Sequence, residues 1–161
     1  MKKLLIRAGM AGTFCLLAGH FLAAYAQDHD LTAYRQGAFH GAKADKPFYY
    51  AIYQLDSADP KLIAQTLSNM RNAMQDTRLK GKLRLELIAF SDGVAVYQKD
   101  HPYEKELLAL RENGVILAQC NNTLQERKIA KETLFPFVAI VPSGNGELII
   151  RQAQGWSLVH P

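Results

Sequence analysis

The strongest constraint on the fold is a regular alternation of short apolar runs with amphipathic segments between residues 48 and 160. The apolar runs, which we predict to be strands, span residues 48–55, 83–90, 115–119, 136–141 and 155–160. Helical patterns lie between or after them at residues 60–74, 94–98, 103–112, 121–128 and 147–154. Strands separated by helices imply right-handed crossovers. We therefore predict an α/β fold with a mostly parallel five-stranded sheet and helices on both faces, which makes three layers.

Three local signals add detail to this prediction. Asp59 is a plausible N-cap, and Pro60 then occupies the first helical position. The segment 143–146 is rich in glycine, so we expect a loop there, either an ordinary turn or, on weak evidence, a phosphate-binding loop. The runs 48–55 and 136–141 are strongly apolar, which fits central parallel strands buried on both faces.

The first 26 residues have the pattern of a secretory signal peptide. Lys2, Lys3 and Arg7 precede an apolar stretch, and residues 24–26 offer a small-x-small cleavage site. The stretch is shorter than the roughly 20 residues of a membrane span, so we expect export to a periplasm and no membrane attachment after cleavage. We read residues 27–47 as a polar, extended or mobile lead-in and residues 48–161 as one domain.

The charge of the chain does not indicate a nucleic-acid partner. Three of the 19 Lys and Arg side chains and none of the 15 Asp and Glu side chains lie in residues 1–26, which leaves 16 basic against 15 acidic groups. The basic character of the sequence is therefore largely a property of the predicted signal peptide. We predict no nucleic-acid binding.

Cys120 is the one cysteine that follows the predicted signal peptide, since Cys15 lies within it. An exported chain with a single remaining thiol forms no internal disulfide. Cys120 stands where a predicted strand runs into a predicted helix, near backbone N–H groups and the positive end of the helix dipole, which favour a thiolate. We weigh a reactive nucleophile equally against a small buried hydrophobe without chemistry.

Polar residues follow the first three predicted strands. They are Asp56 and Ser57 after the first, Ser91, Asp92 and Gly93 after the second, and Asn121 and Asn122 directly after Cys120. The ligand site of an open α/β sheet lies outside the carboxyl ends of its strands, so we expect these residues to meet at one edge. There the asparagines and helix N–H groups would support a persulfide, and Asp92 would orient water or a partner lysine. Helix capping is the favoured alternative for the aspartates.

The sequence does not indicate a cofactor or a structural metal site. It has no Cys-x-x-Cys and no His-x-x-x-His spacing, and its histidines are scattered. One weak possibility is that cleavage after Ala26 creates a terminal Gln27-Asp28-His29 motif, in which His29 would bind copper(II) or nickel(II) in a square plane.

Four segments together resemble one known family. They are residues 50–56 (YAIYQLD), 89–94 (AFSDGV), 114–124 (GVILAQCNNTL) and 141–148 (VPSGNGEL). The chain resembles the DsrE-like proteins over about residues 48–161, in particular a secreted single-domain branch of that family.

The resemblance implies a flavodoxin-like fold that assembles into homo-trimers or homo-hexamers. In better-known relatives a cysteine after the third strand accepts sulfane sulfur as a persulfide from a donor protein and passes it to an acceptor protein, and Cys120 falls on that position. We predict a periplasmic sulfur carrier or sulfurtransferase on this basis. The alternatives are an oligomeric module that binds a small ligand without catalysis, in which Cys120 is structural, and a redox-sensing thiol.

Overall fold

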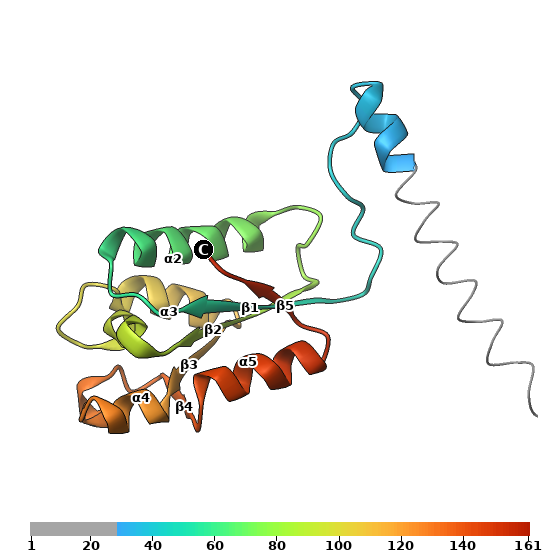
Figure 1. Ribbon diagram of the computed structural model, residues 1–161. Coiled ribbons are helices and arrows are strands. Elements are labelled where there is room, and N and C mark those ends of the chain that lie inside the picture. The colour runs from blue at the N-terminus through green and yellow to red at the C-terminus, as the bar shows by residue number, and fades with distance from the viewer. Residues whose placement is uncertain (1–28) are drawn as a thin grey trace, which may run out of the picture. The chain divides into compact units, whose positions relative to one another are not determined.

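The computed structural model of the protein describes residues 29–161 (Figure 1). The predicted signal peptide, residues 1–26, lies outside this range, as do Gln27 and Asp28. The described residues fall into two units: the first ends at Lys43, and the second begins at Ala44. Residues 29–35 are helical, and Gly37 with a φ of +70° follows their end, so this part of the predicted lead-in is helical and not extended.

The second unit contains one sheet of five strands. They are β1 (Tyr49–Leu55), β2 (Leu83–Ala89), β3 (Ile116–Cys120), β4 (Ala139–Val141) and β5 (Ser157–Val159). Every pairing is parallel, and the strand order is β4-β3-β2-β1-β5. The predicted α/β class with a parallel sheet is confirmed, and the arrangement is flavodoxin-like.

Helices cover both faces of this sheet. They are α2 (Pro60–Gln75), the 3₁₀ helix η1 (Ser91–Tyr97), α3 (Glu104–Glu112), α4 (Asn121–Glu126), the 3₁₀ helix η2 (Lys131–Thr133) and α5 (Gly144–Ala153). Figure 1 shows α2 and α3 on one face and α5 on the other. No helix within residues 29–161 has both the length and the apolar composition needed to cross a bilayer.

The larger core lies between the sheet and the α2 and α3 face. Ile63, Leu67 and Met70 of α2 are fully buried there, against alternate residues of β1 and β2. The predicted start of α2 is confirmed, because Asp59 Oδ1 accepts the N–H of Lys61 at 2.9 Å and Pro60 takes the first helical position.

The apolar sequence of the fourth strand predicted a central position in the sheet, and this prediction is wrong. β4 forms the edge of the sheet and pairs only with β3. It is also shorter than predicted, because Pro136 lies in a turn before the strand begins at Ala139. Ile140 is 36% exposed. Apolar side chains occur on protein surfaces as well as in cores. The apolar composition of a strand therefore does not show whether it is buried in the middle of the sheet or exposed at its edge.

The glycine-rich segment 143–146 is not a loop. Ser143 is the N-cap of α5, and its Oγ accepts the N–H of Gly146 at 3.2 Å, so the helix begins at Gly144. This cap satisfies one of the first free N–H groups of the helix and offsets the low helix propensity of the two glycines.

A buried ion pair attaches α5 to the sheet. Glu86 of β2 is 1% exposed, and its Oε2 accepts the Nε–H of Arg151 at 2.7 Å. Arg151 also pairs with Glu147 at 2.9 Å, and its guanidinium lies 4.3 Å from the ring centre of Trp156. Burial raises the pKa of Glu86, while the charge of Arg151 opposes that rise.

The turn from β2 into η1 passes very close to the end of β1. A Cβ added to Gly93 would lie 2.1 Å from the carbonyl oxygen of Leu55. The N–H of Phe90 donates to the same oxygen at 3.1 Å. Glycine is needed at position 93 because there is no space for a side chain.

Replacing Arg151 by methionine should destabilise the fold by about 3 kcal/mol at pH 7, because the buried Glu86 carboxylate loses its partner. Without the guanidinium the folded-state pKa of Glu86 rises further above its unfolded value, so the loss should shrink as the pH falls and Glu86 takes up a proton. Urea denaturation at pH 7 and pH 5 measures both effects. The control Arg71→Met breaks the exposed Arg71–Glu106 pair and should have an effect below about 1 kcal/mol. Equal losses for the two variants would contradict this account.

Gly93→Ala should destabilise the fold by about 3 kcal/mol or more, since the new Cβ meets rigid backbone. Gly114→Ala is the comparison, because Gly114 has a φ of +83° but no atom within 4 Å of an added Cβ. That change should cost only about 1 kcal/mol of backbone strain. Denaturation curves that rank the two variants in the opposite order would show that space at position 93 is not the constraint.

Candidate functional site

The carboxyl ends of β1, β2 and β3 meet at one edge of the sheet. The carbonyl of Leu55 at the end of β1 accepts from Phe90, the residue after β2. Ser91, the next residue, donates its N–H to the hydroxyl of Thr123 in α4, which follows β3. The three segments that the sequence placed at this edge are therefore in contact through hydrogen bonds.

Cys120 is the last residue of β3 and the N-cap residue of α4. Its thiol is free, and the residue is 5% exposed. Its side chain lies on the same face of the sheet as Ala118, which packs against Leu148 of α5. The sulfur therefore lies between the starts of two helices, α4 and α5.

The surroundings of the sulfur favour its ionised form. Burial of Cys120 has the largest single effect and raises the pKa of the thiol. The N–H and the hydroxyl of Thr123, with the N–H groups of Gly144 and Asn122, together outweigh burial and hold the pKa below its usual value. Cys120 makes no regular N-cap hydrogen bond, so the lowering comes from several donors and not from a single cap. A thiolate in such a site is a nucleophile.

Thr123 is a part of the site that sequence reasoning missed, and it contacts Ser91, which the sequence had placed at this edge. Thr123 is 5% exposed, and its Oγ1 accepts the N–H of Ser91 at 3.0 Å. Ser91 has a φ of +51°, in the left-handed region that is uncommon for a residue with a side chain. The position of Thr123 three residues after the strand end was the available signal, because a residue there faces back toward the N-cap.

Gly144 was also missed as part of the site. It is the first residue of α5, and its N–H supports the Cys120 sulfur. A Cβ at position 144 would lie 2.9–3.1 Å from side-chain atoms of Phe90. The absence of a side chain lets the start of α5 approach both Phe90 and the sulfur. Sequence reasoning had placed this residue in a loop, so its N–H was not counted.

Asp92 lies at the same edge, but its carboxylate forms an ion pair with Arg127, the C-cap residue of α4. Both side chains are exposed, at 61% and 42%. The carboxylate is therefore held by the far end of α4, and it is not among the groups that act on the Cys120 sulfur. The neighbouring Gly93 has the packing role described above.

The remaining candidates take different positions. Asp56 is half-buried and accepts the Nε2–H of Gln54 at 3.2 Å. Capping, the favoured alternative for the aspartates, holds for neither Asp56 nor Asp92, because α2 is capped by Asp59 and η1 has no side-chain cap. Asn122 acts on the sulfur through its backbone N–H, and Asn121 is the half-buried first residue of α4.

Gln119 precedes Cys120 and is completely buried. Its Nε2 donates to the carbonyl of Cys120 at 3.0 Å. Its Oε1 has no hydrogen-bond partner among the described residues, which is rare for a buried polar atom. The amide is hydrogen-bonded to the backbone at the end of β3, where the Cys120 side chain is attached.

Within residues 29–161 there is no group of three or more His, Cys, Asp or Glu side chains that could hold a metal ion. The weak copper or nickel motif includes Gln27 and Asp28, which lie outside the described residues, so the motif at His29 stays a prediction.

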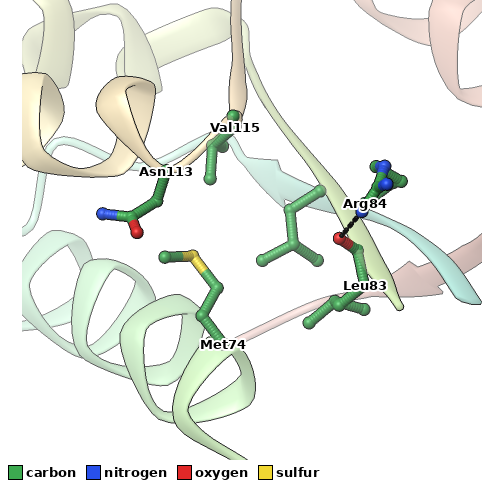
Figure 2. Close-up of a pocket in the computed structure, with 7 residues that line it drawn as sticks. Met74, Leu83, Arg84, Asn113 and Val115 are labelled. Atoms are coloured by element: carbon green, nitrogen blue, oxygen red, sulfur yellow. Dashed lines mark hydrogen bonds between the residues drawn. The ribbon is translucent and has the colours of Figure 1, made fainter. Parts of the chain in front are cut away.

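One cavity of about 170 Å³ lies at the opposite ends of the strands (Figure 2). It is formed by the beginning of β2, the turn before β3 and Met74 of α2. Asn113 donates its side-chain amide to the carbonyl of Ala109, and the Arg84 guanidinium donates to the carbonyl of Leu83. These polar groups have local partners, so the cavity does not compete with the Cys120 edge as a reactive site.

Comparisons with known proteins agree with this fold. The DsrE/DsrF-like family matches residues 48–161. A solved structure described as a protein of unknown function, MTH1491 from Methanobacterium thermoautotrophicum, is 32% identical, has a TM-score of 0.66, and is matched over 70% of this chain and 99% of its own. No curated protein matches the chain. The chain belongs to the DsrE/DsrF-like family, and this membership suggests a role related to sulfur relays.

Proposed function

We propose that the protein is a sulfur carrier in which Cys120 holds sulfane sulfur as a persulfide. The observation that carries this proposal is the place of Cys120 between the starts of α4 and α5, where the Thr123 hydroxyl and nearby backbone N–H groups hold the pKa of the thiol below its usual value despite burial. Family membership adds the sulfur-relay context. Burial alone would raise the pKa of a structural cysteine and keep it as an uncharged thiol. Donors that favour the thiolate are therefore expected at a cysteine that reacts.

The proposed cycle has two substitutions at sulfur. The Cys120 thiolate attacks the terminal sulfur of a donor polysulfide or thiosulfate, a bond from Sγ to that sulfur forms, and the donor's own bond to it breaks. The remainder of the donor leaves with the electron pair. An acceptor thiolate then attacks the outer sulfur of the persulfide, and Cys120 departs as a thiolate. The protein undergoes no net oxidation or reduction.

One observation favours a second candidate, an oligomeric module that binds a small ligand while Cys120 is structural. The residue is 5% exposed, so only small reagents can reach its sulfur. Polysulfide and thiosulfate are small enough to reach the sulfur. Under the first proposal, burial of Cys120 therefore favours small sulfur donors over bulky ones.

The proposal includes export and self-association. Export to a periplasm rests on the basic, apolar and small-residue pattern of residues 1–26. Assembly into a homo-trimer or homo-hexamer is supported by large apolar side chains that are exposed in the second unit, namely Phe48, Tyr50, Ile116, Ile149, Ile150 and Leu158. Sulfur donor and acceptor proteins are the further partners that a carrier requires.

Incubation of the reduced protein with polysulfide or thiosulfate should add sulfur atoms to Cys120. Intact-mass spectrometry would show increments of one sulfur mass that a reductant removes, and peptide mapping would place them on Cys120 rather than Cys15. Cys120→Ser should show no increment at that peptide. An unchanged mass of the wild-type protein, together with slow alkylation of Cys120, would reject the carrier and leave the ligand-binding module.

Gly144→Ala should raise the pH needed to ionise Cys120 and reduce sulfur loading at neutral pH. The new Cβ would crowd Phe90, so the start of α5 must move and its N–H must leave the sulfur. The pH dependence of iodoacetamide alkylation measures this change. Gly146→Ala is the matched control on the same helix turn, because its Cβ would meet only Ser143. If both variants have the wild-type profile, Gly144 does not support the thiolate.

A further inference from the structure

We propose that one edge of the sheet docks on membranes that contain anionic phospholipids. We call it the amino edge, because the strands begin there: residues 45–50 enter β1, residues 76–84 turn from α2 into β2, and residues 111–114 turn from α3 into β3. Cys120 lies at the opposite ends of the strands, so this inference does not depend on the sulfur-carrier function.

The amino edge concentrates positive charge. It has six basic and three acidic side chains, whereas the other residues of 27–161 have ten basic and twelve acidic ones. The basic side chains of the edge are Lys46, Arg78, Lys80, Lys82, Arg84 and Arg111. Each Lys or Arg close to an anionic bilayer strengthens binding by about fivefold, so this edge has the charge that such a surface attracts.

Backbone contacts hold the first two segments of the amino edge side by side. The N–H of Tyr49 donates to the carbonyl of Lys82 at 2.9 Å, and the Lys82 ammonium donates to the carbonyl of Ala44 at 3.0 Å. Figure 1 shows the segment that enters β1 and the turn that enters β2 at the same end of the sheet. Their cations therefore belong to one surface.

Some of these charges are free to meet a partner. Asp76 is engaged with Arg78 at 2.5 Å, and Asp45 accepts the hydroxyl of Tyr49 at 3.1 Å. Lys46 and Lys80 are exposed, and neither forms an ion pair within the part of the chain that the structure describes. The acidic side chains of the edge therefore leave two lysines uncompensated.

Aromatic rings lie beside the cations. Phe48 is 44% exposed and Tyr50 is 41% exposed. The Arg84 guanidinium lies 4.9 Å from the ring centre of Phe48, and the rings of Tyr50 and Trp156 are 5.3 Å apart. Aromatic rings and long basic side chains both favour the boundary between water and lipid, where the ring is buried and the charge stays among the phosphates.

The charge of the amino edge favours a bilayer over a second copy of the chain. Two copies that met through this edge would bring like charges together. Self-association can instead use Ile149 and Ile150, the exposed apolar side chains of α5. An acidic protein is a weaker fit, because three of the six cations are lysines, which are depleted at protein interfaces.

Peripheral docking changes the expectation of no membrane attachment after signal cleavage. That expectation came from the lack of a membrane-spanning segment, and binding through charge and a few buried rings needs no span. Docking by the amino edge would place Cys120 on the side of the domain away from the lipid, where soluble sulfur donors and acceptors are found.

The test is co-sedimentation of the exported, purified chain with lipid vesicles. The protein should pellet with vesicles of phosphatidylglycerol and phosphatidylcholine in equal parts, and it should stay in solution with phosphatidylcholine alone. Added salt should release it, because screening weakens the attraction. Trp156 is the one tryptophan of the chain and contacts Tyr50, so its fluorescence should shift to the blue on binding.

Lys46→Gln combined with Lys80→Gln should lower the affinity for the anionic vesicles about 30-fold. The matched control is Lys128→Gln combined with Lys131→Gln, which removes the same charge from exposed lysines beyond the carboxyl end of β3. The control should change the affinity less than threefold. Phe48→Ser should lower it about fivefold, since the ring no longer enters the lipid. Urea denaturation would verify that each variant is folded.

Three results would overturn the proposal. Equal pelleting with both kinds of vesicle would assign binding to apolar insertion alone, for example by residues 1–26. Equal weakening by the two lysine pairs would assign it to total charge and not to the amino edge. A wild-type protein that ignores anionic vesicles, and whose oligomeric state changes in the Lys46 and Lys80 variant, would assign the edge to a second copy. Sulfur loading of Cys120 is measured separately and bears on none of these results.

Discussion

The parallel pairing of β1, β2 and β3 is the constraint on which the rest of the structure depends. Parallel strands place all their carboxyl ends at one edge, so the segments that follow them must share that edge. The contacts from Phe90 to Leu55 and from Ser91 to Thr123 tie these segments together. A sulfur at the end of β3 thereby lies at the edge where backbone N–H groups of α4 and α5 reach it.

Burial and hydrogen bonding have opposite effects on that sulfur, and their balance decides its chemistry. Burial of Cys120 raises the pKa of the thiol, and the N–H groups with the Thr123 hydroxyl lower it by more. The donors come from α4 and from α5, which lie far apart in the sequence. The Glu86–Arg151 ion pair holds α5 on the sheet, so a buried charge on one strand helps to keep Gly144 beside the sulfur on another.

Much of the fold was predictable from the sequence, because alternating apolar runs and helical spacing report directly on burial. The five strands, the parallel sheet and the Asp59 cap of α2 were predicted on that basis. The place of β4 at the sheet edge and the start of α5 at Gly144 were not. Apolar composition does not encode strand order, and the cap of Ser143 outweighs the glycine content that indicated a loop.

For the site, the sequence by itself determined the position of Cys120 at a strand end and its approach to a helix start. Only the tertiary structure decided that Gly144 reaches the sulfur, since the start of α5 comes to the site through a crossover and through close packing against Phe90. It also decided that Asp92 faces Arg127 and that Gly93 is a packing contact. Residue type and spacing locate a nucleophile, whereas its ionisation depends on distances across the sheet that no local pattern contains.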